Sequence, residues 1–316
     1  MNRVVVAVDA MGGDLGSVAA VEGAVWAVKE NPNLSIILTG PENELEKNLL
    51  KHNHSGDISI IHAPDVIYPS ESPTLAFRRK KESSMVVALK LVKDGKAHGF
   101  VSSGSTGAML TGATVLIGRK KGIERPALGT LLPNAKKGFT LLADSGANMD
   151  SKPSFLLQFA MLGSEYMKNN RGIVSPRIGL INVGHEDEKG NALVKEAYKL
   201  LKESDLNFVG NIEGREIPSG DVDVAVCDGF TGNVVLKFME GAAKSMMGMI
   251  KEELMSTTVS KIGALLARGA FKKIKTRFDY REVGGAPFLG LNHLVIKAHG
   301  SSDALAFKNA ILQIKE

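Results

Sequence analysis

Residues Val4–Asp14 read VVVAVDAMGGD, a short apolar run that ends in an acidic, glycine-rich loop. Apolar runs of this kind, such as Val4–Val8, Arg177–Ile181 and Val222–Val226, are typical of buried parallel strands. Six such loops occur along the chain: DAMGGD (Asp9–Asp14), SSGSTG (Ser102–Gly107), DSGAN (Asp144–Asn148), NVGHEDEKGN (Asn182–Asn191), DGFTGN (Asp228–Asn233) and AHGSSD (Ala298–Asp303). The pattern predicts an α/β protein with a doubly wound, mostly parallel sheet.

Strand-like and helix-like segments alternate along the whole chain. We expect strands at Val4–Val8, Leu34–Thr39, Ile58–His62, His98–Val101, Leu128–Leu132, Thr140–Ala143, Arg177–Val183, Asn207–Gly210, Val222–Cys227 and His293–Ala298. We expect helices at Ser17–Glu30, Glu42–Lys51, Thr74–Lys93 (broken near Ser83 and Ser84), Ala108–Ile117, Lys152–Lys168, Ala192–Glu203, Val234–Phe278 and Asp303–Ile314. No linker or short repeat interrupts the pattern, which predicts a single domain over residues 1–316 with a projecting helical segment at 240–285.

Composition limits the classes of protein to which the chain can belong. Its 39 basic and 34 acidic side chains give a net charge of +5, which is too small an excess to indicate nucleic-acid binding. The single cysteine, Cys227, excludes an intramolecular disulfide and fits a reducing cytoplasm. The start of the chain resembles a first strand rather than a signal peptide. No stretch approaches the roughly 20 apolar residues that span a bilayer, so we expect any membrane contact to be peripheral.

The glycine loops predict a binding site for a small anion. Ligands of open α/β sheets lie beyond the carboxyl ends of the strands, where such loops gather. Glycine allows backbone amides to approach an anion closely, and a following helix contributes its positive N-terminal end. No G-x-G-x-x-G follows the first strand, and no P-loop motif is present, which argues against dinucleotide or P-loop nucleotide binding. A single loop of this kind is an ordinary turn, but six together favour one large site for a phosphate-like group.

The six loops, in this order and with the segment RRKKESSM at Arg78–Met85, resemble the bacterial phosphate acyltransferase family of phospholipid synthesis. The resemblance covers essentially the whole chain. It implies a fold similar to isocitrate and isopropylmalate dehydrogenases and to phosphotransacetylases. It also implies reversible transfer of a long-chain fatty acyl group from acyl carrier protein to inorganic phosphate, which forms acyl phosphate. No cofactor is expected, and the resemblance further implies a homodimer.

This chemistry requires positioning and charge stabilisation more than a strong base, because orthophosphate is already anionic. We expect SSGSTG to bind phosphate through Ser103, Gly104, Ser105, Thr106 and Gly107. Lys189 is the expected cation for the oxyanion or the leaving thiolate. Asp228 and Asn233 are expected to orient Lys189, phosphate or the thioester. Lys189 as a solvated loop lysine and Asp228 as a helix cap are the open alternatives.

Further polar residues of the loops are expected to shape the site. These site-lining candidates are Asp9, Gly12, Gly13, Asp14, Asp144, Asn148, Asn182, His299, Ser301 and Asp303. No metal-ligand spacing such as HxH or HExxH occurs, so we expect no metal. Cys227 could serve as a nucleophile toward a thioester. Its place at the end of a buried strand favours a structural role.

Two surfaces are candidates for partners. Arg78, Arg79, Lys80 and Lys81 form a basic run that would suit the acidic acyl carrier protein, although a solvated helix face is an equal alternative. The segment Leu254–Phe278 carries six basic residues and no acidic one. Its apolar spacing predicts two short amphipathic helices around a bend near Gly269. We expect this segment to contact an anionic membrane, and the downstream membrane glycerol-phosphate acyltransferase is a further candidate partner. The expected contact residues are Leu265, Leu266, Phe271, Lys272 and Lys273. Two ordinary helices at a core or dimer interface are the alternative.

Three other functions compete with long-chain phosphate acyl transfer. A short-chain phosphotransacetylase that uses acyl coenzyme A would share the chemistry, but the basic amphipathic segment favours the long-chain reaction. A non-catalytic anion- or lipid-binding protein would need fewer polar loops. A dehydrogenase on a similar fold would need the metal cluster or dinucleotide motif that the sequence lacks.

Overall fold

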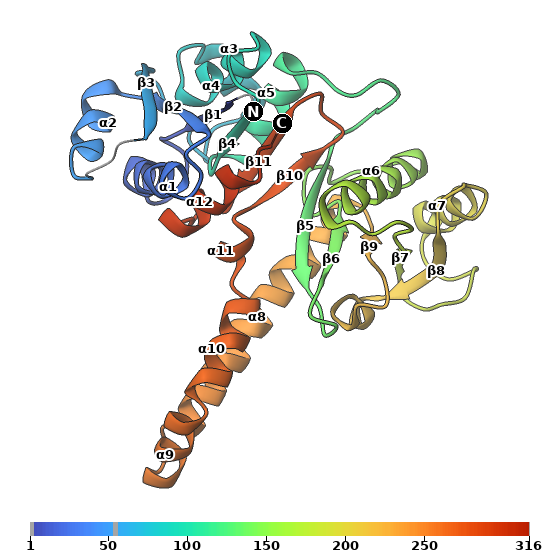
Figure 1. Cartoon of the computed structure of the whole chain (residues 1–316). Coiled ribbons are helices and arrows are strands. Elements are labelled where there is room, and N and C mark those ends of the chain that lie inside the picture. The colour runs from blue at the N-terminus through green and yellow to red at the C-terminus, as the bar shows by residue number, and fades with distance from the viewer. Residues whose placement is uncertain (1–2, 53–55, 316) are drawn as a thin grey trace.

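The computed structural model describes residues 3–52 and 56–315 (Figure 1). Within them, eleven strands form one sheet in the order β3-β2-β1-β4-β11-β10-β5-β6-β9-β7-β8. The strands are β1 (Val4–Asp9), β2 (Leu34–Gly40), β3 (Asp57–His62), β4 (Gly99–Ser102), β5 (Ala127–Pro133), β6 (Phe139–Ala143), β7 (Ile178–Asn182), β8 (Phe208–Glu213), β9 (Val224–Val226), β10 (Gly285–Leu289) and β11 (Leu294–Ala298). The predicted α/β fold with a mostly parallel sheet is confirmed.

Helices cover both faces of the sheet (Figure 1). They are α1 (Gly16–Glu30), α2 (Glu42–Leu49), α3 (Pro73–Arg79), α4 (Ser84–Lys93), α5 (Thr106–Leu116), α6 (Pro153–Arg171), α7 (Ala192–Lys202), α8 (Gly229–Leu254), α9 (Thr258–Leu266), α10 (Arg268–Arg277), α11 (Tyr280–Val283), α12 (Ala304–Leu312) and the 3₁₀ turn η1 (Gly214–Ser219). Around β1, β2, β4 and β11, α1 and α12 bury one face and α3, α4 and α5 the other. Around β6, β7 and β9, α6 and α7 form one layer, and η1 and the start of α8 form the other.

The sheet consists of two parallel blocks that run in opposite directions. Strands β3, β2, β1, β4 and β11 are mutually parallel, and so are β6, β9, β7 and β8. Two strands between the blocks, β10 and β5, reverse the direction through antiparallel pairs. The sequence predicted β5 and β6 as adjacent strands but missed β10, whose glycine and proline are unusual in a strand.

The two central strands pair over only a short distance. Phe288 and Leu289 of β10 pair with Leu128 and Ala127 of β5. Beyond these pairs β10 continues alongside β11, whereas β5 continues alongside β6. The two halves of the sheet therefore diverge and open a fork between them (Figure 1). The end of β11 and the end of β6 lie on the two sides of this fork.

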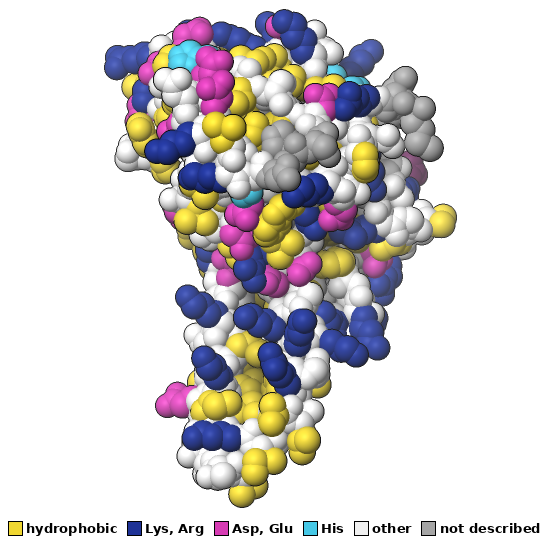
Figure 2. All heavy atoms as spheres, turned by 60° about the vertical axis from the view of Figure 1, so that its left-hand side comes forward, with side chains coloured by type: hydrophobic (Ala, Val, Ile, Leu, Met, Phe, Trp, Pro, Cys, Tyr) yellow, Lys and Arg dark blue, Asp and Glu magenta, His cyan; other side chains and the backbone are white. Residues whose placement is uncertain are grey.

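A helical arm projects from the sheet, as predicted. Helix α8 leads outward, α9 lies at the tip, and α10 leads back toward α11 (Figure 1). The predicted bend lies at Ala267, between α9 and α10, and Gly269 is inside α10. Basic and hydrophobic side chains alternate over the arm's surface in Figure 2. Among the helices of residues 3–52 and 56–315, none is long and apolar enough to cross a membrane.

Candidate active site

The fork between β10 and β5 contains a pocket of about 280 Å³. Its walls come from both halves of the sheet and from the first turns of α8. The lining residues are Thr106, Leu128, Thr130, Leu131, Ser145, Asn233, Leu236, Lys237, Glu240, Tyr280, Val283, Gly284, Gly285, Ala286, Lys297, Ala298, His299 and Gly300. Four of the six predicted loops contribute directly to this wall, so the structure brings distant loops to one place.

One side of the pocket rests on three loops that pack tightly together, DAMGGD, SSGSTG and AHGSSD. Ser103 Oγ donates a hydrogen bond to the carbonyl of Gly12 (2.7 Å), and the Asp14 amide donates to the carbonyl of Gly300 (2.8 Å). A Cβ atom on Gly12 would lie 2.5 Å from the Gly104 amide nitrogen, so no larger residue fits between these loops. Gly13 has a φ of +80°, which also favours glycine.

Asp9 holds the loops DAMGGD and SSGSTG in place through hydrogen bonds to both. Its buried carboxylate accepts hydrogen bonds from Ser102 Oγ (2.7 Å) and from the Met11 amide (3.2 Å). Burial raises the pKa of Asp9, while these donors oppose the rise. Asp9 is therefore a brace for the loops rather than a group that faces the pocket.

The predicted phosphate-binding residues have different positions in the structure. Thr106 lines the pocket at the start of α5. The Ser103 hydroxyl donates its hydrogen bond to the Gly12 carbonyl, and the Gly104 amide donates to Ser102 Oγ (2.9 Å). Ser105 caps α5, and Gly107 packs against Pro73 of α3. Phosphate binding by this loop stays a prediction, and Thr106 is the residue that the geometry supports.

The opposite side of the pocket rests on DSGAN and DGFTGN. Asp144 is buried, and its two carboxylate oxygens accept hydrogen bonds from the amides of Leu128, Gly146, Ala147 and Asn148 and from Asn148 Nδ2. Burial raises the pKa of Asp144, and the amide donors oppose the rise. The Asn148 carbonyl accepts from the Gly229 amide (2.8 Å), which joins the two loops. This places Ser145 and Asn233 in the same wall.

One face of α8 supplies the next part of the wall. Asn233, Leu236, Lys237 and Glu240 recur at helical spacing and all line the pocket. Asp228 caps the same helix, where its carboxylate accepts from the amide (2.9 Å) and from the hydroxyl (2.7 Å) of Thr231. The structure thus supports the capping alternative for Asp228, and it brings Asn233 to the pocket.

Two lysines and a histidine face this pocket together. Lys297 Nζ from β11 donates to the main-chain carbonyls of Ser103 (3.3 Å) and Ala298. Lys237 Nζ from α8 lies 2.9 Å from Glu240 Oε2 and 3.2 Å from His299 Nε2. His299 Nδ1 lies 2.8 Å from Ser301 Oγ, and the ring is 5.0 Å from the ring of Tyr280. Burial, and then the charge of Lys237, lower the pKa of His299.

The loop NVGHEDEKGN (Asn182–Asn191) does not reach the pocket. It follows β7, which is separated from β6 by β9. Lys189 is half exposed and lies 3.5 Å from Glu186 of its own loop, while Asn182 Nδ2 donates to the Lys189 carbonyl (3.1 Å). The loop contacts β8, where His185 Nδ1 lies 3.1 Å from the Asn211 carbonyl. The catalytic role of Lys189 therefore stays a prediction without geometric support.

Asp303 is a structural residue in this arrangement. It caps α12 through the Ala306 amide (3.1 Å) and forms an ion pair with Arg281 (2.8 Å). Within residues 3–52 and 56–315, no three His, Cys, Asp or Glu side chains are grouped to hold a metal ion.

Cys227 is buried at the end of β9, and its Sγ lies 3.6 Å from the Asp144 carbonyl. Burial, followed by the charges of Asp228 and Asp144, raises the pKa of this thiol well above its usual value. A thiol that stays protonated is a poor nucleophile. We expect Cys227→Ser to retain the acyl transfer that the family resemblance implies, at a rate of the same order as the native protein, measured as initial acyl phosphate formation. An acyl-enzyme on the native protein, detected by intact mass, would contradict this prediction.

The predicted partner surfaces are largely exposed. Arg78 and Arg79 lie exposed at the end of α3, whereas Lys80 forms an ion pair with Glu71 (2.7 Å) and Lys81 lies over the ring of Phe77. On the arm, Leu265 and Leu266 are 68% and 83% exposed. Lys272 and Lys273 are exposed, and Phe271 is partly buried.

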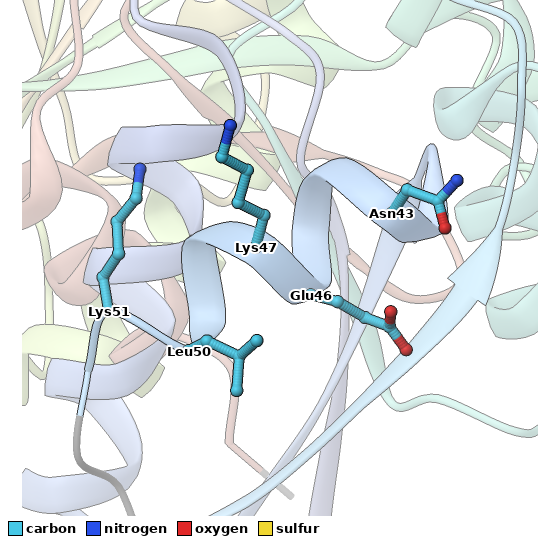
Figure 3. Close-up of a pocket in the computed structure, with 5 residues that line it drawn as sticks. All are labelled: Asn43, Glu46, Lys47, Leu50 and Lys51. Atoms are coloured by element: carbon cyan, nitrogen blue, oxygen red, sulfur yellow. The ribbon is translucent and has the colours of Figure 1, made fainter.

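A second depression, of about 470 Å³, lies on α2 (Figure 3). Its lining residues all come from this helix and the residues just after it: Asn43, Glu46, Lys47, Leu50 and Lys51. The side chains diverge from one another in Figure 3. No set of converging groups is present in this depression, so the fork is the better candidate for a reactive site.

Sequence reasoning missed Lys237 and Lys297. Lys297 is the charged residue of an otherwise apolar strand, LVIKA, and a lysine in such a place is rarely buried without a role. Lys237 lies four residues after Asn233, hence on the same helix face. Both signals are present in the sequence, but the loops alone did not reveal them.

Comparisons with known proteins show the family to which the chain belongs. A profile of the family described as "Fatty acid synthesis protein" matches residues 4–316. The "Phosphate acyltransferase" of Clostridium botulinum (strain ATCC 19397 / Type A) is 53% identical over 312 residues, which cover 98% of this chain and 93% of the relative. The chain belongs to the phosphate acyltransferase family. It is therefore an acyltransferase of fatty acid or phospholipid synthesis.

Solved structures support the fold of this family member. A phosphotransacetylase from Streptococcus pyogenes matches with a TM-score of 0.64 at 20% identity, covering 99% of this chain and 93% of that chain. A putative 4-hydroxythreonine-4-phosphate dehydrogenase from Salmonella typhimurium matches with a TM-score of 0.53 at 12% identity, covering 99% of both chains. The fold is thus similar to phosphotransacetylases, as the sequence predicted, and to dehydrogenases of this second type.

Proposed function

We propose that the enzyme transfers a long-chain acyl group reversibly from acyl carrier protein to inorganic phosphate, in the fork between β10 and β5. This proposal rests on the combination of charged, hydrogen-bonding and apolar side chains in the pocket. Lys237, Lys297 and Thr106 offer charge and hydrogen bonds for phosphate, whereas Leu131, Leu236 and Val283 offer apolar contact for an acyl chain. A pocket with both properties suits a substrate pair of one anion and one fatty thioester.

The reaction needs no acyl-enzyme. A phosphate oxygen forms a bond to the thioester carbonyl carbon, and the carbon–sulfur bond then breaks with its electron pair on sulfur. The proton of hydrogen phosphate is transferred to the thiolate, so that acyl phosphate and a free thiol are the products. The protein contributes position and electrostatic stabilisation of the developing oxyanion.

One assay tests this function. Purified protein is incubated with palmitoyl-acyl carrier protein and phosphate, and acyl phosphate and free thiol are measured. We expect both products in equal amounts, with a rate at low substrate that falls as salt rises, because Arg78 and Arg79 would guide the acidic carrier protein. Acetyl coenzyme A is the parallel substrate. Turnover of acetyl coenzyme A alone would assign the short-chain reaction instead.

The arm is the proposed contact with an anionic membrane surface in the cytoplasm. Acyl phosphate of a long chain is hydrophobic, and delivery at a membrane would bring it to a glycerol-phosphate acyltransferase there. The segment combines exposed leucines with basic residues, as interfacial helices do. A homodimer, as the family resemblance implies, is part of the same proposal.

Glutamate at both tip leucines is expected to release the protein from anionic vesicles. Removal of two leucines from the interface, at about 1.5–3 kcal/mol each, predicts a loss of binding of about 100-fold or more. Vesicle flotation of Leu265→Glu/Leu266→Glu measures it. The matched control is Leu50→Glu/Val174→Glu, since these residues are 87% and 88% exposed and lie outside the arm. Equal flotation of the two double variants would disprove membrane contact through the tip.

A further inference from the structure

Lys297 is a partly buried cation without a carboxylate partner. Within the described part of the chain, its Nζ hydrogen bonds only with the carbonyls of Ser103 and Ala298, and it forms no ion pair. Lys237 approaches the same pocket from α8 and has Glu240 as its partner. The two lysines come from segments that are 60 residues apart in sequence and meet at one cavity.

Such an arrangement is unfavourable unless an anion compensates the two charges. Removal of an ammonium group from water costs several kcal/mol unless an opposite charge compensates it. Burial, and then the charge of Lys237, lower the pKa of Lys297 to about 8, while the charges of Asp14 and Asp9 act against the shift. An anion in the pocket would compensate both lysines. Further anion-binding groups lie in the same wall.

Thr106 provides such groups. It is the first residue of α5, so its backbone and hydroxyl lie at the positive end of that helix. It lines the pocket together with both lysines. The carbonyl to which Lys297 donates belongs to Ser103, three residues earlier in the same loop. The lysine thus stands beside the loop that the sequence predicted for phosphate.

We propose that Lys297 is the catalytic residue that binds the attacking phosphate, with Lys237 closing the same anion site from α8. This rests on the proposed function. Lys297 holds the phosphate dianion beside the thioester and offsets the negative charge while the new carbon–oxygen bond forms. The ammonium group keeps its proton throughout, because the proton for the thiolate comes from hydrogen phosphate.

Kinetics of Lys297→Met test the assignment. A charged hydrogen bond is worth about 1.5–3 kcal/mol, so the KM for phosphate is expected to rise about 10- to 150-fold. The KM for palmitoyl-acyl carrier protein is expected to stay unchanged. Lys237→Met is expected to shift the phosphate KM in the same direction. The matched control is Lys199→Met on α7, which is exposed and outside the pocket. An unchanged phosphate KM in Lys297→Met would overturn the inference.

The pH dependence gives a second readout. Above pH 8 the native Lys297 loses its charge, so the phosphate KM is expected to rise about tenfold for each further pH unit. Lys297→Arg keeps its charge and is expected to remove this rise. The charged and titratable groups that act on Lys297 are Lys237 on α8, Asp9 at the end of β1, Asp14 in the loop after β1, and His299 just after β11. A rise that persists in Lys297→Arg would assign the titration to another group and contradict the proposal.

Thermal unfolding with and without inorganic phosphate separates binding from activity. Phosphate is expected to raise the Tm of the native protein and not that of Lys297→Met. Without phosphate the variant is expected to be at least as stable as the native protein, because an uncompensated charge is removed. A merely structural lysine would give a less stable variant. Lys297-dependent phosphate binding in a protein that makes no acyl phosphate would support the anion site and reject the proposed function.

Discussion

Alanine in place of Asp144 is expected to lower the free energy of unfolding by at least about 3 kcal/mol and to abolish acyl transfer. The carboxylate accepts five hydrogen bonds, of which those from the Leu128 amide and from the amide and side chain of Asn148 are buried. Each buried donor that loses its partner costs about 1–3 kcal/mol. The loop that carries Ser145 would also lose its fixed shape.

Denaturant unfolding and the palmitoyl transfer assay measure this effect. Asp150→Ala is the matched control, because Asp150 is an exposed carboxylate that lies just after the same loop. Asp144→Asn keeps one acceptor oxygen and is expected to lie between the alanine variant and the native protein. If Asp144→Ala were as stable as Asp150→Ala, the hydrogen bonds of the Asp144 carboxylate would not hold this loop in place.

Gly232→Ala is expected to lower both the stability of the protein and the rate of acyl transfer. A Cβ atom on Gly232 would lie 1.9 Å from the Asp144 carbonyl oxygen, so the first turn of α8 must move away from β6. Overpacking of this kind costs about 1–3 kcal/mol, occasionally more. The movement would displace Asn233, and a shift of about 1 Å in a catalytic site lowers rates by about 100-fold.

The same helix contains the matched control. A Cβ atom on Gly241 would meet nothing within 4 Å. Gly241→Ala is expected to stabilise the protein by about 0.5–1 kcal/mol, since alanine loses less conformational entropy in a helix. The two variants should thus change stability in opposite directions by thermal or denaturant unfolding. Destabilisation of equal size at both positions would contradict the close contact of α8 with β6.

Most of the fold was predictable from local patterns. Apolar runs and glycine loops predicted ten of the strands, because a buried strand needs a continuous apolar sequence whatever its neighbours are. The antiparallel strand β10 was missed, since Gly285 and Pro287 are unfavourable for a strand by local propensity. Its partners β11 and β5 supply the pairing that stabilises it. The opposite directions of the two parallel blocks depend on this strand, so they could not be predicted from local sequence patterns.

The candidate site was predictable only in part. Loops that directly follow strands were recognisable, and the structure brings Thr106, Asn233 and His299 to the fork. Tertiary contacts decide which loop residues line the pocket and which hold the loops in place. The carboxylates of Asp9 and Asp144 belong to the second group, because they accept hydrogen bonds from backbone amides. Lys189 was predicted from its place beside a strand end, but the strand order places β9 between its loop and β6. Lys297 lines the pocket because β11 pairs with β10, and local sequence patterns did not predict this pairing.

A crystal structure with a non-hydrolysable acyl phosphonate bound tests most directly whether the fork is the active site. We predict the phosphonate within hydrogen-bond distance of Lys297 Nζ and Thr106, with the acyl chain against Leu131, Leu236 and Val283. The analogue bound at the loop Asn182–Asn191, with the fork empty, would contradict this assignment.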